Sequence, residues 1–158
     1  MKSDLKNFLI DYFPSPNGDN EELLKLLNET SKIICDWFSL SEELTPLPQY
    51  TKKLISEPDM FGCEINKLLD DINSLIYSSF NPSHPGSLAH LDPPPLAISI
   101  IGDLVAGALN NNLLAEELSP CISIIENDLC KWLANEVGFG NSAGGIAASG
   151  GTLNNLNA

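Results

Sequence analysis

The stretch GGIAASGGTLNNL, residues 144–156, decides which fold class the sequence indicates. Ile146-Ala147-Ala148 is short, apolar and uncharged, as in a buried strand, and Leu153–Leu156 begins a helical pattern after a glycine turn. One strand, one turn and one turn of helix cannot bury a core, and the strands of a parallel sheet are joined through helices. The stretch therefore predicts the severed start of an α/β domain.

The turn Ser149-Gly150-Gly151-Thr152 carries the strongest chemical signal in the sequence. Glycines let backbone N–H groups approach an anion closely, and a helix N-terminus adds unpaired donors and a partial positive charge. The Thr152 hydroxyl can add a hydrogen bond or cap the helix. The nucleotide-binding patterns GxxxxGKS/T and GxGxxG are absent, so the turn predicts either another kind of anion site or a plain tight turn capped by threonine.

The residues before this stretch predict a mainly α-helical chain. Apolar residues recur at helical spacing in five segments, which are Leu5–Phe13, Asn20–Phe38, Cys63–Ser79, Leu96–Asn110 and a last segment from Ser119 to Gly138. In the last segment Ser119 is expected to cap the helix, Pro120 to occupy its first position and Gly138 to end it. The side chains expected on the buried face of that helix are Ile124, Ile125, Leu129, Trp132, Leu133 and Val137.

A proline-rich loop is predicted over residues 81–95, where five prolines exclude a helix or a central strand. Both histidines of the chain, His84 and His90, fall inside this loop. We expect them to form hydrogen bonds within the loop or to line a pocket, and we expect no metal site because further ligands are lacking nearby. The amides of 110–112 predict a helix end, or alternatively a set of ligand-binding groups.

The charge of the chain restricts its partners. The sequence contains 21 acidic residues and eight lysines but no arginine, which gives a net charge of −13. Phosphate contacts require clustered cations, so neither nucleic acid nor an anionic membrane surface is an expected partner.

Other features predict a cytoplasmic location. The four cysteines lack CxxC spacing and are expected to be reduced and buried. The first residues, MKSDLKNFLIDYF, carry acids within their apolar stretch, unlike a secretion signal. The longest apolar region, residues 96–109, is interrupted by Asp103 and is too short to span a bilayer.

Several short motifs, taken in order, resemble one enzyme family. They are His84-Pro85, Leu91-Asp92-Pro93, Ile101-Gly-Asp103-Leu104, Ala108-Leu109-Asn110, Leu118-Ser119-Pro120 with Glu126, and Gly145–Leu156. Together these motifs resemble the group II pyridoxal-phosphate-dependent decarboxylases, which include aromatic amino-acid, glutamate, histidine and diaminobutyrate decarboxylases. The resemblance is densest from His84 to Ala158.

The resemblance implies a fold and a division of the chain. Residues 1–80 would be a helical N-terminal segment that forms a homodimer or larger assembly. Residues 81–158 would hold the substrate loop and the truncated start of a large α/β domain of the aspartate-aminotransferase type, which binds pyridoxal phosphate. Within this part, Gly150, Gly151 and Thr152 would hold the cofactor phosphate. The residues that would line the pocket of the amino-acid substrate are His90, Leu91, Asp92 and Pro93.

The sequence also departs from the family pattern. Family catalysis needs a lysine that forms the internal aldimine, an aspartate beside the pyridine nitrogen and a histidine stacked on the ring. No lysine follows Lys131 and neither histidine precedes a lysine, so no catalytic residue is assigned here. We therefore expect an N-terminal fragment of a decarboxylase that is inactive alone and binds the cofactor weakly or not at all. The alternatives are a non-enzymatic helical dimerisation module and a half-enzyme completed by another chain.

Overall fold

The computed structural model describes residues 14, 16, 18–45, 47, 63–88, 93–140 and 142–157. Within these residues every regular element is a helix, which confirms the mainly α-helical expectation. The chain divides into two compact units, residues 1–94 and 95–158, and each is described by itself. The helix expected over Leu5–Phe13 lies outside the described residues, and the expected domain division at residue 80 remains a prediction.

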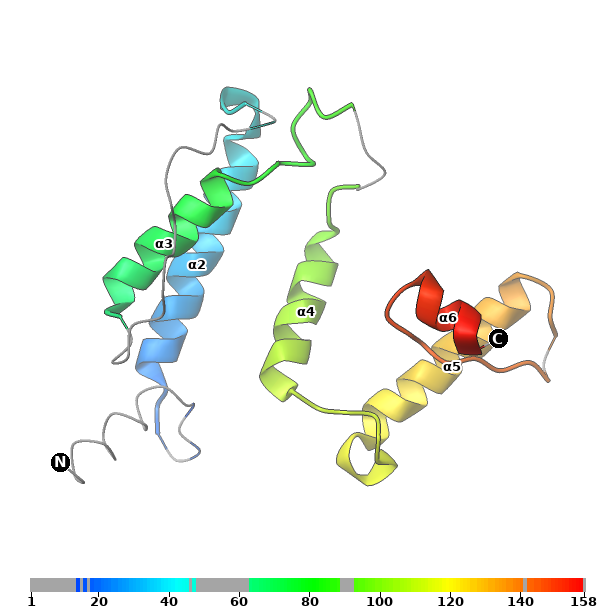
Figure 1. Ribbon diagram of the computed structural model, residues 1–158. Coiled ribbons are helices and arrows are strands. Elements are labelled where there is room, and N and C mark those ends of the chain that lie inside the picture. Colours follow the sequence, from blue (N-terminus) through cyan, green and yellow to red (C-terminus); the bar gives the residue numbers. More distant parts are fainter. Residues whose placement is uncertain are drawn as a thin grey trace. The chain divides into compact units, whose positions relative to one another are not determined.

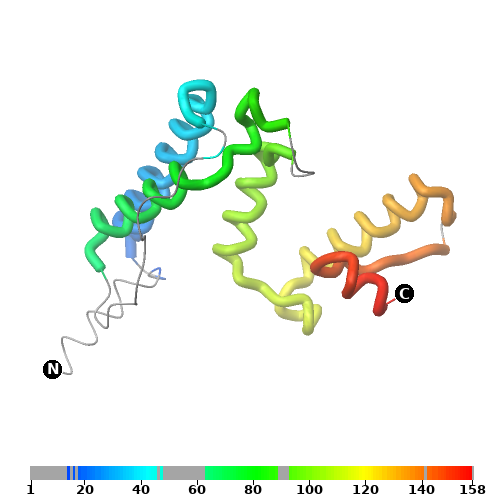
Figure 2. The backbone as a smooth tube through the Cα atoms, turned by 45° about the horizontal axis from the view of Figure 1, so that its top comes forward, coloured from blue at the N-terminus to red at the C-terminus, as the bar shows by residue number. Residues whose placement is uncertain are grey.

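The first unit is built on two packed helices, α2 (Glu21–Ser39) and α3 (Ile65–Tyr77). They lie side by side and run in the same direction (Figures 1 and 2). The Asp19 carboxylate accepts a hydrogen bond of 3.4 Å from the Glu21 amide, and acidic residues in the first turn of α2 favour the helix dipole. Apolar side chains on both helices are half-buried, including Leu27 and Ile34 of α2 and Ile72 of α3. Both helices agree with their predicted bounds to within two residues.

A loop over residues 78–88 closes the C-terminal ends of this helix pair. Asn81 is 2% exposed; its Nδ2 donates to the Trp37 carbonyl over 3.5 Å, and its Oδ1 accepts from the Ser83 amide over 2.9 Å. The Nε2 of His84 lies 2.9 Å from the carbonyl oxygen of Leu44, just after the short helix η1 (Ser41–Glu43). The loop is therefore attached to α2 and to η1 by side-chain hydrogen bonds.

The second unit begins with α4 (Ala97–Leu109), which is apolar around its whole circumference except for Ser99 and Asp103. Asn110, in the left-handed conformation at φ 46°, ends the helix, and its amide donates to the Ala106 carbonyl over 3.0 Å. The amides of residues 110–112 thus mark a helix end, as one of the two expectations had it. Among the described residues of the second unit α4 packs against no other helix, and most of its large apolar side chains are exposed.

Helix α5 (Pro120–Glu136) follows the short helix η2 (Glu116–Leu118), and both of its ends carry the expected residues. Pro120 occupies the first helical position. At the other end Gly138 has φ +86°, its amide donates to the Asn135 carbonyl, and the Phe139 amide donates to the Ala134 carbonyl. These two bonds form a Schellman motif, in which glycine is favoured because it adopts positive φ without steric cost.

The predicted buried face of α5 is wrong. The six apolar side chains expected to be buried are all exposed: Ile124, Ile125, Leu129, Trp132, Leu133 and Val137. Ala134, at 7% exposure, is instead the single buried apolar residue of the described part of the chain. The periodicity identified an apolar stripe correctly, but a stripe is buried only where another element covers it, and here the chain covers a different face.

Two further expectations need correction. Residues 146–148 form no strand, and Ile146 is 66% exposed, because a strand is completed by backbone bonds to a neighbouring strand and the described residues provide none. The cysteines are unpaired, but Cys35, Cys63 and Cys121 are exposed rather than buried.

No helix in the described ranges is long and apolar enough to cross a membrane.

Candidate functional site

The predicted anion turn lies at the start of a short helix, α6 (Gly151–Asn157). The first backbone bond of this helix runs from the Asn154 amide to the Gly150 carbonyl over 3.2 Å. The amides of Gly151, Thr152 and Leu153 precede that bond, as the first amides of any helix do, so they have no acceptor within the helix. Gly150, Gly151 and Thr152 are all exposed residues.

Gly150 gives the turn its shape. Its φ is +93°, a conformation that residues with a Cβ atom rarely adopt, and its amide donates to the Ala148 carbonyl over 3.1 Å. A Cβ atom built on either Gly150 or Gly151 would meet nothing within 4 Å. Glycine is thus favoured at position 150 by the backbone, whereas at position 151 the space around the residue is open.

The donors of the turn fit an anionic oxygen. Backbone amides at a helix start and a threonine hydroxyl are the groups that hold phosphate in many proteins. Lys131 is the last lysine of the sequence and there is no arginine, so residues 132–158 offer a phosphate only these uncharged donors. Among the described residues no three histidine, cysteine, aspartate or glutamate side chains gather as a metal site.

A return segment, residues 143–148, carries the turn back along α5 (Figures 1 and 2). The Ala147 amide donates to Glu126 Oε1 of α5 over 2.8 Å. Gly145 lies so close to α5 that a Cβ atom built on it would be 3.3 Å from the Cβ atom of Cys130. Glu126 belongs to the motif with Leu118-Ser119-Pro120 but was given no role from the sequence; its place in that motif was the signal that could have drawn attention to it.

The expected substrate loop is only partly described. His90, Leu91 and Asp92 lie outside the described residues. Pro93 is exposed and belongs to the first unit, whereas Gly150–Thr152 belong to the second. The grouping of these residues into one site therefore remains a prediction.

His84 has a structural role in its loop, as one of the two expectations had it. The Gly86 amide donates to His84 Nδ1 over 2.8 Å, so Nδ1 is an acceptor and the proton of the neutral ring is on Nε2. That nitrogen donates to the Leu44 carbonyl. Both ring nitrogens are therefore used to hold the loop.

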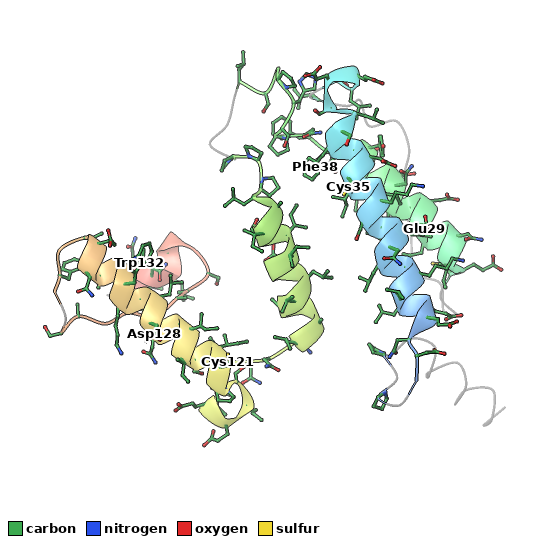
Figure 3. All side chains as sticks on the ribbon, turned by 180° about the vertical axis from the view of Figure 1, so that it is seen from behind. Glu29, Cys35, Phe38, Cys121, Asp128 and Trp132 are labelled. Carbon is green, nitrogen blue, oxygen red and sulfur yellow. The ribbon has the colours of Figure 1, made fainter. Side chains whose placement is uncertain are left out.

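The side chains at the start of α5 make no hydrogen bond to its free amides. Figure 3 labels Cys121 at this end of α5 and Asp128 and Trp132 further along the helix. Ser119 is 1% exposed and its Oγ has no hydrogen-bond partner, so it stands at the cap position without capping the helix. Its φ of −149° and ψ of 51° differ from the extended conformation in which a cap side chain reaches the helix amides.

Comparison with known proteins shows similarity to amino-acid decarboxylases, although no family model matches the chain. The chain is 29% identical to an L-2,4-diaminobutyrate decarboxylase of Acinetobacter baumannii over 133 residues, which cover 82% of this chain and 26% of that protein. It is 32% identical to an L-aspartate decarboxylase of Metarhizium robertsii over 100 residues, 63% of this chain and 20% of that protein. It is 26% identical to the cysteine sulfinic acid decarboxylase of Mus musculus over 142 residues, 87% of this chain and 26% of that protein. The chain thus spans about a quarter or less of the length of these relatives.

Proposed function

The chain is homologous to the group II pyridoxal-phosphate-dependent decarboxylases, and from this premise we propose that it is a segment of an amino-acid carboxy-lyase. The observation that carries the proposal is the turn at Gly150–Thr152, which combines a positive φ at Gly150, open space around Gly151 at the helix start, and three exposed residues. The names of the relatives support an amino acid with a short, charged side chain as substrate.

In this proposal the turn holds the phosphate of the cofactor. The amides of Gly151 and Thr152 and the Thr152 hydroxyl donate to phosphate oxygens, and Gly150 supplies the bend that points them outward. His90–Pro93 contact the substrate. The bound cofactor supplies a ring that takes up the electron pair left when the α-carboxylate departs.

The proposal has a specific consequence for the polypeptide of 158 residues. Because no lysine follows Lys131 and neither histidine precedes a lysine, this polypeptide lacks the group that holds the cofactor covalently in the family. It therefore releases no carbon dioxide from amino acids above the rate of free pyridoxal phosphate, and it binds the cofactor weakly or not at all. The severed start of an α/β domain over residues 81–158 belongs to the same proposal.

The remaining parts of the proposal concern assembly and location. The exposed apolar side chains of the first unit, such as Leu24 and Leu75, support a homodimer formed through the helices of residues 1–80. Four cysteines that are all unpaired support a reducing, cytoplasmic location.

A chimera tests the function. The chain replaces the stretch that it matches in the Acinetobacter baumannii diaminobutyrate decarboxylase, and bound cofactor and released carbon dioxide are measured. We expect the chimera to retain pyridoxal phosphate and to decarboxylate diaminobutyrate. A folded chimera without bound cofactor overturns the proposal. If the long replacement does not fold, a graft of residues 144–156 alone gives the same decision.

Variants of the chimera identify the donors. Thr152→Val keeps the shape of the side chain and removes its hydroxyl, and we expect it to raise the Kd of pyridoxal phosphate about tenfold, the effect of one hydrogen bond to a charged group. Thr152→Ser restores most of the affinity, because it returns a hydroxyl. The matched control is Ser142→Ala, which removes an exposed hydroxyl elsewhere and leaves the Kd unchanged.

A further inference from the structure

One face of α5 differs from the rest of the helix in burial and in residue type. Glu126 and Cys130 are half-buried and Ala134 is buried, whereas most other residues of the helix are exposed. These three residues are spaced by four, so they lie on one side of the helix. These three residues are one carboxylate and two small side chains, whereas the apolar residues that flank them, Leu133 and Val137, are exposed.

The return segment covers this face through two successive attachments, which follow the Schellman motif at the end of α5. Gly145 lies against Cys130, and the Ala147 amide donates to Glu126 over 2.8 Å. The small side chain of Cys130 allows the backbone to approach closely. At Glu126 the longer carboxylate side chain reaches the backbone and provides its acceptor.

We propose that Glu126 is a positioning residue for the turn at Gly150–Thr152, an inference that rests on the proposed function. Glu126 accepts the last hydrogen bond that holds the return segment to α5 before the turn. The donor, Ala147, precedes Gly150 by three residues, which span at most about 10 Å of extended chain. Beyond Ala147 the path is fixed by two backbone bonds, from the Gly150 amide to the Ala148 carbonyl and from the Asn154 amide to the Gly150 carbonyl. Fixing Ala147 therefore fixes the direction in which the amides of Gly151 and Thr152 point.

The chemistry of the bond suits this role. A carboxylate that accepts from a backbone amide makes a charge-assisted hydrogen bond, which is stronger than one between neutral groups. Lys131 is the only lysine of the second unit, which contains no arginine or histidine, so few cations compete there for Glu126. Without this acceptor the return segment would be attached to α5 only through Gly145 and through the Schellman motif at Gly138.

The first test uses the thiol of Cys130 in the full chain as a reporter of the return segment. Cys35, Cys63 and Cys121 are exposed and are replaced by serine, so that only the half-covered Cys130 remains. We expect Glu126→Ala to raise the rate of maleimide labelling about tenfold, as the loss of one hydrogen bond implies. Glu126→Gln keeps an oxygen acceptor and stays within about threefold of the parent.

Hydrogen exchange of single amides separates positioning from a general loss of stability. In Glu126→Ala the amides of Gly150 and Asn154 exchange faster, whereas the amides within α5 exchange as in the parent. The matched control is Glu136→Ala, which removes an exposed glutamate from the same helix and changes neither labelling nor exchange. Unchanged labelling and exchange in Glu126→Ala, or a parent whose Gly150 amide is unprotected, overturns the inference.

The chimera connects this result to the cofactor. We expect Glu126→Ala to raise the Kd of pyridoxal phosphate about tenfold in the chimera and Glu126→Gln to recover most of the affinity. If labelling and exchange show that Glu126→Ala releases the return segment but the Kd of pyridoxal phosphate is unchanged, the positioning role is overturned and the proposed function stands. A chimera that binds no cofactor with Glu126 intact overturns the proposed function, and the thiol and exchange data still report on the attachment itself.

Discussion

At the scale of single residues, Ser119 shows how a correct local signal can lack its expected bond. It precedes Pro120 at the start of α5, yet its hydroxyl is buried and unpartnered while its carbonyl accepts from both the amide and the hydroxyl of Ser123. A capping serine is worth about 1 kcal/mol, whereas a buried polar group without a partner costs about 1–3 kcal/mol.

The structure therefore predicts that Ser119→Ala leaves the free energy of unfolding unchanged or raises it by up to about 1 kcal/mol. Urea unfolding followed by Trp132 fluorescence in a Trp37→Phe background measures this change. Ser142→Ala, at an exposed serine, is the matched control and should have no effect. A loss of about 1 kcal/mol in Ser119→Ala would indicate instead that the serine caps the helix in solution.

His84 is a second residue whose role depends on the bonds it makes. Its two ring nitrogens bond the Gly86 amide and the Leu44 carbonyl, which attaches the loop of residues 78–88 to η1. We expect His84→Ala to lower the free energy of unfolding of the first unit by about 1–3 kcal/mol, the sum of two ordinary hydrogen bonds. Urea unfolding followed by Trp37 fluorescence in a Trp132→Phe background measures the loss.

Two conservative variants separate the two bonds of His84. Asparagine places an acceptor near the position of Nδ1, and glutamine places a donor near the position of Nε2. Each should therefore recover about half of the stability lost in His84→Ala. If all three variants unfold like the parent, the ring does not hold the loop.

At the scale of elements, replacing either of two glycines by alanine is expected to change stability in opposite directions. Gly138 has φ +86° and nothing within 4 Å of its absent Cβ, so Gly138→Ala costs only backbone energy, about 1–2 kcal/mol. Gly107 lies within α4, also with open space around it, so Gly107→Ala removes unfolded-state freedom and stabilises that helix by about 0.5–1 kcal/mol. Circular dichroism during thermal unfolding measures both changes.

The control for Gly138 is asparagine, which tolerates the left-handed conformation better than alanine. Gly138→Asn should therefore lose less stability than Gly138→Ala. Equal losses in the two variants would show that the positive φ is not what fixes this residue.

The same elements show what sequence alone could predict. Helix ends followed from local chemistry: Pro120 begins α5, and Asn110 and Gly138 end α4 and α5 as expected. The buried face of α5 did not follow, because burial depends on which segment covers the helix, and the return segment covers Glu126 and Cys130 instead of the apolar stripe. The strand over residues 146–148 failed for the same reason, since it needs a partner from elsewhere in the fold.

In the candidate site, too, one part could be predicted from the sequence and another could not. The turn at Gly150–Thr152 was predictable because glycine and threonine act through the local backbone at a helix start. Glu126 was not assigned a role, because its bond to Ala147 joins residues 21 positions apart and no local pattern encodes that pairing. Local sequence patterns thus predicted the donors of the turn, whereas the bond from Ala147 to Glu126 could be identified only from the structure.

At the scale of the whole molecule, the balance between apolar surface and charge decides how the chain associates. Apolar side chains are exposed along α2, α4 and α5, and surfaces of this kind mark interfaces or aggregation sites. The net charge of −13 opposes association, and salt weakens this repulsion because the Debye length falls from about 10 Å at 0.1 M to about 3 Å at 1 M. We therefore expect a dimer or larger species at micromolar concentration, with a Kd that falls as salt is raised.

Sedimentation equilibrium of two matched variants then locates the interface. Leu24 of α2 is 57% exposed and Leu104 of α4 is 47% exposed, so glutamate at either position adds a charge without filling a core. If the helices of residues 1–80 form the dimer, Leu24→Glu dissociates it, because an interface cannot bury an unpaired carboxylate cheaply, whereas Leu104→Glu leaves it intact. The reverse result would assign the interface to α4, and a monomer at every salt concentration would contradict the dimer itself.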